Sequence, residues 1–389
     1  MKRDLQPPLK ILFVVHEMYA SGAPAVLLDF MHWLKNENKN VVFDILTLNA
    51  QGVLYDDFTK LSRKVLELPK GSLRTRKRIL NALIGQKTTP MQLFGESLQA
   101  ENYTHIYINS MFSLNVLHHV NAYVKNVKKI IHVHESEFLN ELYFTNTKQE
   151  NLLSLIDGFI AVSEHVKSNL IEKYQIKKDI IEVVYPFVKE EVSIEDLSIL
   201  KELNIKETDF IIATIGNPHN VKGTDIVPLL VKKIKKNYPD FKFKFLIIGG
   251  HNSNEAIISA KIDARKLNIE DNLIFVNHVN NVNQYFPLLD AYVLTSREES
   301  FSLMVAKAVY NEVPVIMFAN NGGPCEIISA SNAHVVEYLD LDQMAEIIYS
   351  VKENYDEAKK KCKDAKLKIE NVFSTLNTFE RIHNFVINI

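Results

Sequence analysis

Short apolar runs alternate with segments of helical hydrophobic spacing along the whole chain. This alternation is typical of parallel β-strands joined by crossover helices. In the first half, the runs that predict strands lie at 11–16, 41–48, 64–68, 104–109, 129–134, 159–163 and 181–185. In the second half they lie at 210–216, 243–248, 272–277, 291–296 and 314–318. The pattern therefore predicts an α/β protein with two doubly wound parallel sheets.

Apolar residues at helical spacing fill the segments between these runs. They predict helices at 24–35, 164–174, 222–238, 254–267, 299–311 and 323–331. Residues from 340 onward are also expected to be helical, with a last helix at about 375–389. One face of that helix is apolar and consists of Leu376, Phe379, Ile382, Phe385 and Val386. This face needs a packing partner, and the first domain is one candidate.

The domain boundary is expected where the first alternation ends. The run 183–187 is the last strand-like segment of the first half, and the charged segment 189–206 has no strand signal. Such a segment is typical of a linker. We therefore expect an N-terminal domain over 1–187 and a C-terminal domain over 188–374.

Composition and charge exclude several classes of protein. The chain has 45 Lys and Arg residues against 47 Asp and Glu residues, which leaves no basic excess for nucleic acid as a partner. Its two cysteines, Cys325 and Cys362, cannot build a disulfide framework and match no zinc or redox spacing. The apolar run at 11–15 is too short for a secretion signal, and no run approaches the ~20 residues of a membrane span. We therefore expect a soluble, cytoplasmic protein.

Glycine is scarce, with 12 in 389 residues, so the position of each glycine is informative. In the second half, glycines lie in three places: Gly216 with Gly223, Gly249 with Gly250, and Gly322 with Gly323. Each place follows an apolar run. Glycine at the carboxyl end of a strand lets the backbone turn sharply and bring its N–H groups close to an anion, where open α/β sheets bind ligands.

The segment 291–316 is the most informative part of the chain. Its strand ends at Ser296, an acidic loop follows, and a helix is expected from about Phe301. The first amides of that helix, those of Phe301, Ser302 and Leu303, would suit a diphosphate. A simpler alternative is that Glu298 and Glu299 only interact with the helix end.

The stretch 296–303 resembles the signature of the retaining GT-B glycosyltransferases, the large family marked by Glu-x7-Glu and typified by family 4. The resemblance implies that Glu299 is the first acid of the motif, beside the donor sugar, and that the amides of Ser300, Phe301, Ser302 and Leu303 hold the phosphates. The second acid usually accepts from the ribose hydroxyls, but Lys307 stands at its position. A lysine has donors only and cannot make that contact.

A second stretch, 214–223, resembles the Gly-Arg…Lys-Gly segment in which this family clamps the donor diphosphate. Gly216 and Lys222 match it, while Asn217 stands where arginine is common, so one cation is missing. Taken without the resemblance, Lys222 before Gly223 would be a solvated turn lysine. The stretch 320–327 resembles the Gly-Gly-x-x-Glu turn after the last strand, in which Gly322 and Gly323 open a helix.

Two stretches of the first half complete the resemblance. The segment 16–24 is similar to the glycine loop after the first strand, of which Gly22 remains, and this loop approaches the donor phosphate. The segment 130–135 is similar to the strand end whose histidine, here His134, faces the transferred sugar. His132 would share a face with His134, but the sequence offers no third ligand for a metal.

Ser163 is expected to cap the helix that follows it.

The segment 60–87 is strongly basic. It carries an apolar stripe beside nine cations and a lone acid, Glu67. Such a surface could adsorb to anionic lipid or hold a lipid-linked acceptor. A solvated helix face packed on the first domain is an equal alternative.

The resemblance implies two facing Rossmann-like domains with a cleft between them, the first for the acceptor and the second for the donor. It implies transfer of a hexose-type sugar from a nucleotide sugar to a glycan or lipid-linked acceptor, with retention and without metal or other cofactor. Lys222 and loop amides would stabilise the leaving diphosphate, and His134 and Glu299 would orient the sugar. We expect a role in bacterial-type surface polysaccharide or glycoconjugate synthesis, in the cytoplasm or peripherally at the inner membrane face.

Two alternatives remain open at this point. Asn217 and Lys307 also fit a GT-B-shaped binding or regulatory subunit that has lost turnover. A nucleotide-sugar epimerase uses two such domains as well.

Overall fold

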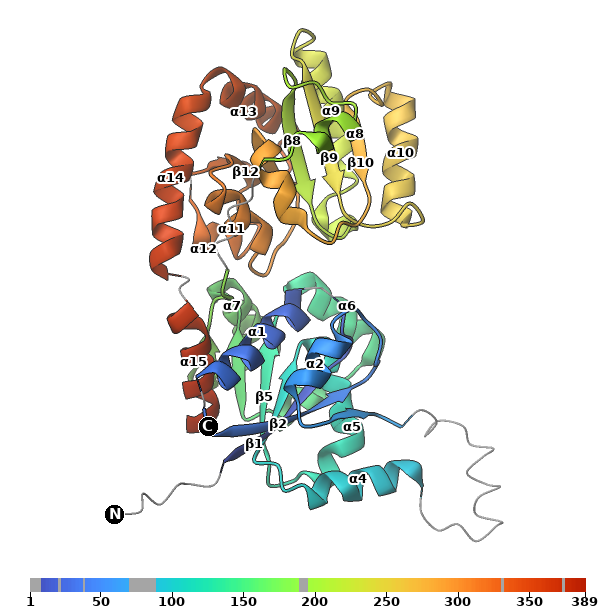
Figure 1. Cartoon of the computed structure of the whole chain (residues 1–389), viewed down its shortest axis with the longest axis vertical. Helices are drawn as coiled ribbons and strands as arrows, with labels where there is room; N and C mark the ends of the chain where they lie inside the picture. The colour runs from blue at the N-terminus through green and yellow to red at the C-terminus, as the bar shows by residue number, and fades with distance from the viewer. Residues whose placement is uncertain are drawn as a thin grey trace. The chain divides into compact units, whose positions relative to one another are not determined.

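The computed structural model describes residues 8–19, 22–37, 39–69, 89–188, 195–329, 332–372 and 375–389. The chain divides into two compact units (Figure 1). The first unit is Met1–Tyr185 together with Leu376–Ile389, and the second unit is Pro186–Thr375. Each unit is built around its own parallel sheet.

The first unit contains a seven-stranded parallel sheet in the order β3-β2-β1-β4-β5-β6-β7. The strands are β1 (Leu9–Val15), β2 (Val41–Thr47), β3 (Val65–Glu67), β4 (His105–Asn109), β5 (Lys128–Val133), β6 (Gly158–Ala161) and β7 (Ile181–Val183). The helices are α1 (Gly22–Asn36), α2 (Tyr55–Leu61), α4 (Pro90–Ala100), α5 (Leu117–Val120), α6 (Glu137–Thr147), α7 (Glu164–Tyr174) and α15 (Thr375–Asn388). The strand order reverses between β1 and β4, so this pair is the topological switch point of the sheet.

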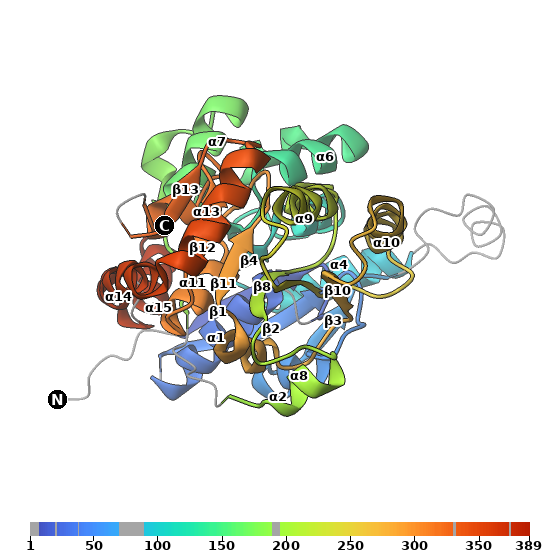
Figure 2. The ribbon, with the colours of Figure 1, turned by 90° about the horizontal axis from the view of Figure 1, so that it is seen from above.

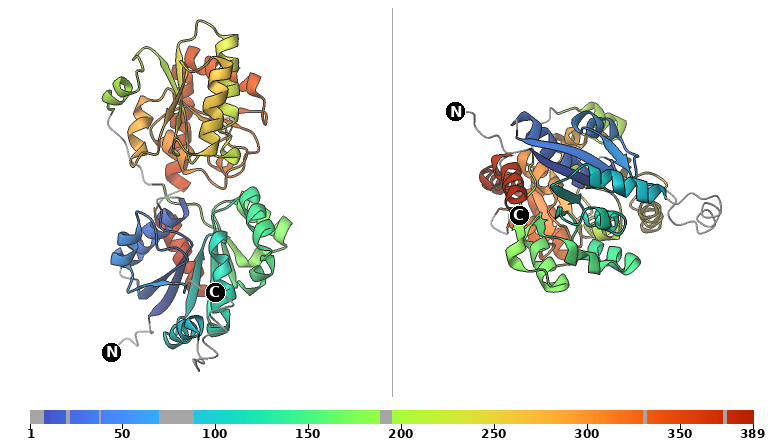
Figure 3. Two further views of the ribbon diagram at one scale, coloured as in Figure 1. Left: turned by 90° about the vertical axis from the view of Figure 1, so that its right-hand side faces the viewer. Right: turned by 90° about the horizontal axis from the view of Figure 1, so that it is seen from below.

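The core of the first unit forms around β1. Phe13 is fully buried and its ring meets Phe30 of α1, Phe43 of β2 and Tyr107 of β4 edge-on. The final helix, α15, packs beside α1, because its Phe379 stacks on Phe30. In Figure 3 this red C-terminal helix lies against the first unit. Its apolar face thus lies on the first unit.

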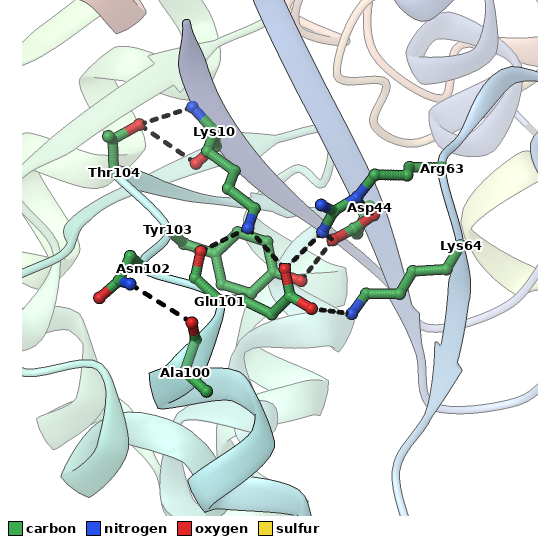
Figure 4. A network of polar contacts seen from close by, with 9 residues as sticks. All are labelled: Lys10, Asp44, Arg63, Lys64, Ala100, Glu101, Asn102, Tyr103 and Thr104. Carbon is green, nitrogen blue, oxygen red and sulfur yellow. Dashed lines mark hydrogen bonds and ion pairs between the residues drawn. The ribbon is translucent and has the colours of Figure 1, made fainter. Parts of the chain in front are cut away.

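A network of charged side chains crosses the first unit near the amino ends of its strands (Figure 4). Asp44 of β2 is fully buried, accepts two hydrogen bonds from Arg63 at 3.0 and 2.6 Å, and accepts a third from Tyr103 Oη at 2.6 Å. Glu101 contacts the side chains of Lys10, Lys64 and Arg63. These hydrogen-bonded cations, Lys10 first, hold the pKa of Glu101 well below its usual range.

The network includes two cations of the basic segment 60–87, since Arg63 and Lys64 are paired with acids of their own unit. Residues 70–87 of that segment lie outside the described residues. In the part of the chain that the structure describes, no helix has the length and apolar content to cross a bilayer.

The second unit contains a six-stranded parallel sheet in the order β10-β9-β8-β11-β12-β13. Figure 2 labels five of these strands: β10, β8, β11, β12 and β13. The strands are β8 (Phe210–Ile215), β9 (Phe243–Ile248), β10 (Leu273–Val276), β11 (Ala291–Leu294), β12 (Val315–Phe318) and β13 (His334–Val336). The helices are α8 (Ser198–Glu202), α9 (Ile226–Asn237), α10 (Glu255–Leu267), α11 (Leu303–Tyr310), α12 (Pro324–Ile327), α13 (Leu341–Glu353) and α14 (Tyr355–Val372). Here the order reverses between β8 and β11.

The predicted fold class, two Rossmann-like parallel-sheet domains, is confirmed. Ser163 caps α7, as expected, by accepting from Val166 N over 3.1 Å. The helix predicted over 222–238 begins only at Ile226, because Gly223 takes a left-handed conformation with φ of +67°. The helix predicted over 323–331 is wrong in length, since α12 ends at Ile327.

Candidate functional site

The carboxyl ends of β8 and β11 mark the candidate site of the second unit. The chain runs from β8 outward through β9 and β10 and then returns to β11 beside β8. In open parallel sheets the loops that leave such a pair diverge, and a ligand can bind between them. The two loops here, 216–225 and 295–302, contain most of the residues that the sequence analysis singled out.

Hydrogen bonds join these two loops. Thr295 Oγ1 donates to the carbonyl of Lys222 over 2.9 Å, and the amide of Arg297 donates to the carbonyl of Val221 over 2.7 Å. A Cβ on Gly223 would lie 2.0 Å from the carbonyl oxygen of Thr295. Only glycine permits this approach, so Gly223 is what places Lys222 against the second loop.

Lys222 and Glu299 form an ion pair where the loops meet. Lys222 Nζ lies 2.6 Å from Glu299 Oε1 and 2.7 Å from Oε2, and Ser296 Oγ donates to Oε1 over 2.6 Å. The Glu299 side chain is 6% exposed, whereas that of Lys222 is 34% exposed. A buried carboxylate is therefore held by a lysine that still reaches solvent. Such a cation can also contact an anionic ligand.

The backbone of Glu299 is fixed by the turn after β12. Its amide donates to the carbonyl of Asn321 over 2.7 Å, and its carbonyl accepts from the amide of Gly323 over 3.0 Å. A Cβ on Gly323 would lie 2.1 Å from the carbonyl oxygen of Ser300, so this contact also requires glycine. Loops from β8, β11 and β12 thus converge on Glu299.

These contacts correct the predicted start of the helix after β11. We expected a helix from about Phe301, but α11 begins at Leu303. Ser302 precedes it with φ of 75°, and Phe301 is buried. The segment Ser300 to Ser302 therefore leads from Glu299 into α11, whose first-turn amides have no carbonyl partner within the helix.

Gly216 and Asn217 begin the loop after β8. Gly216 contacts the end of β9 rather than the loop after β11. The amide of Gly216 donates to the carbonyl of Ile248 over 3.0 Å, and a Cβ on Gly249 would lie 2.1 Å from the Gly216 carbonyl oxygen. A Cβ on Gly216 itself would meet nothing within 4 Å. Gly216 thus lies beside the end of β9, and the next residue, Asn217, is exposed.

Lys307 lies on α11, half-buried, and its Nζ donates to Asn283 Oδ1 over 2.8 Å. Asn283 belongs to the 3₁₀ segment Val282–Leu288. The helix predicted over 299–311 would place Lys307 on nearly the same face as Glu299. Glu299 instead precedes α11, so the two residues do not share a helix. The second acid position of the motif is therefore occupied by a lysine that is paired within its own unit.

In the first unit, Asn109 links His134 to the first turn of α1, which begins at Gly22. His134 Nε2 lies 3.0 Å from Asn109 Oδ1, and Asn109 Nδ2 donates over 3.0 Å to the carbonyl of Ala23, the residue after Gly22 in α1. Asn109 is the last residue of β4, and His134 directly follows β5. The strand ends around the switch point of the first sheet thus connect His134 to the start of α1, through Asn109 and Ala23.

The surroundings of His134 favour its neutral form. Burial, and then the charge of His16, lower the pKa of His134 to about 3. Its ring lies 4.0 Å from that of His132, whose pKa burial also lowers and whose Nδ1 lies 2.7 Å from Tyr107 Oη. Among the described residues, no group of three His, Cys, Asp or Glu side chains is arranged to hold a metal ion, so His132 and His134 have no third ligand there.

Sequence reasoning missed Asn109 and the buried acid Glu135. Glu135 accepts from Ser110 Oγ over 2.5 Å and from the amides of Met111 and His134, both over 3.1 Å. Burial raises the pKa of Glu135. The available signal was a polar residue at the end of each of two neighbouring apolar runs, 104–109 and 129–134.

Two protein-family models match this chain, one in each half. Residues 196–368 match the family model "Glycosyl transferases group 1", and residues 20–192 match the model "Glycosyltransferase Family 4". The chain carries the two domains of a GT-B glycosyltransferase.

Curated relatives match parts of the chain. An uncharacterized glycosyltransferase of Haemophilus influenzae is 27% identical over 134 residues, 34% of this chain and 36% of the relative. The N-acetyl-alpha-D-glucosaminyl L-malate synthase of Bacillus anthracis is 29% identical over 192 residues, 49% of each protein. The chain thus matches at most about half the length of these two relatives.

Among solved structures, the fold is similar to that of the Anabaena protein HepE, crystallised with UDP and glucose. The TM-score is 0.78, the sequence identity is 16%, and the match covers 98% of this chain and 100% of HepE. At this identity the likeness concerns the fold.

Proposed function

We propose that the protein transfers a hexose-type sugar from a nucleotide sugar to a glycan or lipid-linked acceptor, with retention at the anomeric carbon and without a metal. The observation that carries this proposal is the Lys222–Glu299 pair, held by three loops at the switch point of the second sheet. The glycosyltransferase relatives and the binding of UDP and glucose by HepE support it. We also propose a role in surface polysaccharide or glycoconjugate synthesis.

The chemistry of the proposed reaction suits these residues. The barrier lies in separating a diphosphate from a sugar that becomes oxocarbenium-like, so donors and positive charge at the diphosphate lower it. Lys222 and the amides from Ser300 to Leu303 would supply both. Glu299 would accept hydrogen bonds from sugar hydroxyls. His134 of the first unit, in its neutral form, would accept a hydrogen bond from a substrate hydroxyl.

The decisive experiment begins with a thermal-shift screen of nucleotides and nucleotide sugars, with UDP and UDP-glucose first. A ligand that binds only the folded state raises the unfolding temperature. Transfer to glycan and lipid-linked acceptors is then measured for each donor that binds, and the anomeric configuration of the product is read by NMR. Binding of no nucleotide would refute the proposal, and products of inverted configuration would refute retention.

A second candidate, a non-catalytic binding subunit, is favoured by Lys307. Its Nζ is paired with Asn283 at the position where the family usually has a ribose-binding acid. Tight nucleotide-sugar binding with neither transfer nor donor hydrolysis would establish this alternative.

Replacing Lys222 by alanine is expected to weaken nucleoside diphosphate binding by about 1.5–3 kcal/mol, the scale of a charge-assisted contact. Titration calorimetry measures the effect. Lys233→Ala is a matched control, because Lys233 forms an exposed ion pair with Asp342 between α9 and α13. Equal affinity of Lys222→Ala and wild type would remove Lys222 from the binding site.

Replacing Lys307 by glutamate is expected to weaken nucleoside diphosphate binding by about tenfold, because it places an acid near the phosphates. The Asn283 amide can rotate to donate to the new carboxylate, so the fold should tolerate the change. Lys307→Gln, which keeps a donor for Asn283, is the control and should have a smaller effect. Tighter binding by Lys307→Glu would instead mean that an acid restores a ribose contact.

A further inference from the structure

We propose that Asn109 is a positioning residue that holds His134 in the tautomer protonated on Nε2, so that Nδ1 accepts a hydrogen bond from a substrate hydroxyl. This inference rests on the proposed function for the identity of the substrate. The tautomer itself follows from the hydrogen bonds around Asn109.

The orientation of the Asn109 amide is set by its second partner. The carbonyl of Ala23 can only accept, so the group that faces it at 3.0 Å must be the Nδ2 donor. Oδ1 therefore faces His134 Nε2 at 3.0 Å, and an oxygen acceptor requires a proton on that nitrogen. In a neutral imidazole the other nitrogen, Nδ1, then carries the lone pair.

The site gives Asn109 little freedom to rotate. Asn109 is 1% exposed and ends β4, where it lies in register with Val15 of β1 and His132 of β5. It thus occupies the switch point of the first sheet, between the loop that leads to α1 and the strand end that carries His134. A shift of α1 relative to β5 would break one of its two hydrogen bonds.

The groups that face His134 explain why an amide stands here rather than a carboxylate. His132 lies under the ring, and His16 repels a proton on it. Glu135 is the acid nearest in sequence, and its carboxylate oxygens accept hydrogen bonds from Ser110 Oγ and from the amides of Met111 and His134. An aspartate at 109 would be a direct counter-charge and would favour the imidazolium, which has no acceptor nitrogen.

The test is the isosteric change Asn109→Asp, compared by imidazole ¹⁵N NMR with the full-length wild type. We expect the wild type to show His134 neutral and protonated on Nε2 from pH 5 to 8. In Asn109→Asp the His134 signal should become that of an imidazolium at low pH. Transfer by the variant should fall on the order of 10–100-fold at low pH and recover as the pH rises and His134 loses its proton. UDP affinity should stay within about twofold, since Lys222 and Glu299 belong to the other unit.

Asn169→Asp is a matched control. Asn169 is buried on α7 and contacts another histidine, with its Nδ2 3.3 Å from His165 Nε2. This variant should leave the His134 signals and the pH profile unchanged. If Asn109→Asp does not fold, the wild-type spectrum alone still tests the tautomer.

Three results would overturn the proposal: a wild-type His134 protonated on Nδ1 or on both nitrogens, an Asn109→Asp variant whose His134 signals match wild type, or full transfer at low pH by a variant whose His134 is an imidazolium. A wild type with the expected spectrum that binds no nucleotide would refute the proposed function and the substrate role, while the tautomer assignment would stand.

Discussion

Glu299→Gln is expected to lower the rate of sugar transfer by about 10²-fold while it tightens the binding of free nucleoside diphosphate about three- to fivefold. The two effects have opposite signs because Glu299 has two roles, one toward the sugar and one toward Lys222. Its carboxylate would orient the sugar in the reaction, but in the structure both of its oxygens hold Lys222 at 2.6 and 2.7 Å. A diphosphate must compete with that carboxylate for the lysine, and glutamine removes the competitor.

Glutamine should preserve the local structure. It has the shape of glutamate and can still accept from Ser296 Oγ, and the backbone bonds of Glu299 to Asn321 and Gly323 do not depend on its side chain. The measurements are kcat at saturating donor and titration calorimetry with UDP. Glu298→Gln, a change of the same charge one residue earlier, is the control. Unchanged turnover would reduce Glu299 to a structural acid, and weaker UDP binding would mean that the ion pair positions Lys222 for the phosphate.

Most strands could be predicted from the sequence, because parallel strands buried on both faces appear as continuous apolar runs. β13 was not predicted, since only two of its three residues, Val335 and Val336, are apolar and Glu337 follows them directly. The helix start at Phe301 was wrong for a different reason. A tertiary contact, the hydrogen bonds between Glu299 and the turn after β12, overrides the local helical spacing.

For the candidate site, single residues could be predicted from the sequence, whereas the contacts between them could not. The family resemblance predicted Lys222 and Glu299 as separate site residues, but they are 77 residues apart, and their pairing depends on β8 lying beside β11. Asn109 and His134 meet because β4 and β5 pair in a register that places Asn109 beside His132. Lys307 meets Asn283, which lies in an irregular segment without a periodic pattern. Residue types at strand ends are therefore predictable, whereas their partners require the strand order.

The charge network of the first unit makes a second strong prediction. Asp44 is buried at 0% exposure, and its carboxylate depends on Arg63 and Tyr103 for hydrogen bonds. Removing one partner of a buried ion pair costs about 3–5 kcal/mol because an uncompensated charge remains inside the protein. The Arg63 side chain is 46% exposed, so water can reach part of the pair and the low end of that range applies.

Arg63→Met is therefore expected to destabilise the first unit by about 3 kcal/mol. Urea unfolding followed by tryptophan fluorescence reports on this unit alone, because the single tryptophan of the chain is Trp33 of α1. Lys64→Met is the control, since within the described residues Lys64 forms its ion pair with the partly exposed Glu101, and the change should cost at most about 1 kcal/mol. Adding Asp44→Asn to Arg63→Met should restore part of the loss, because the buried charge is removed and the new amide oxygen can still accept from Tyr103. If the double variant is less stable than Arg63→Met by the full cost of a second lesion, the penalty comes from lost packing around Arg63 rather than from the charge of Asp44.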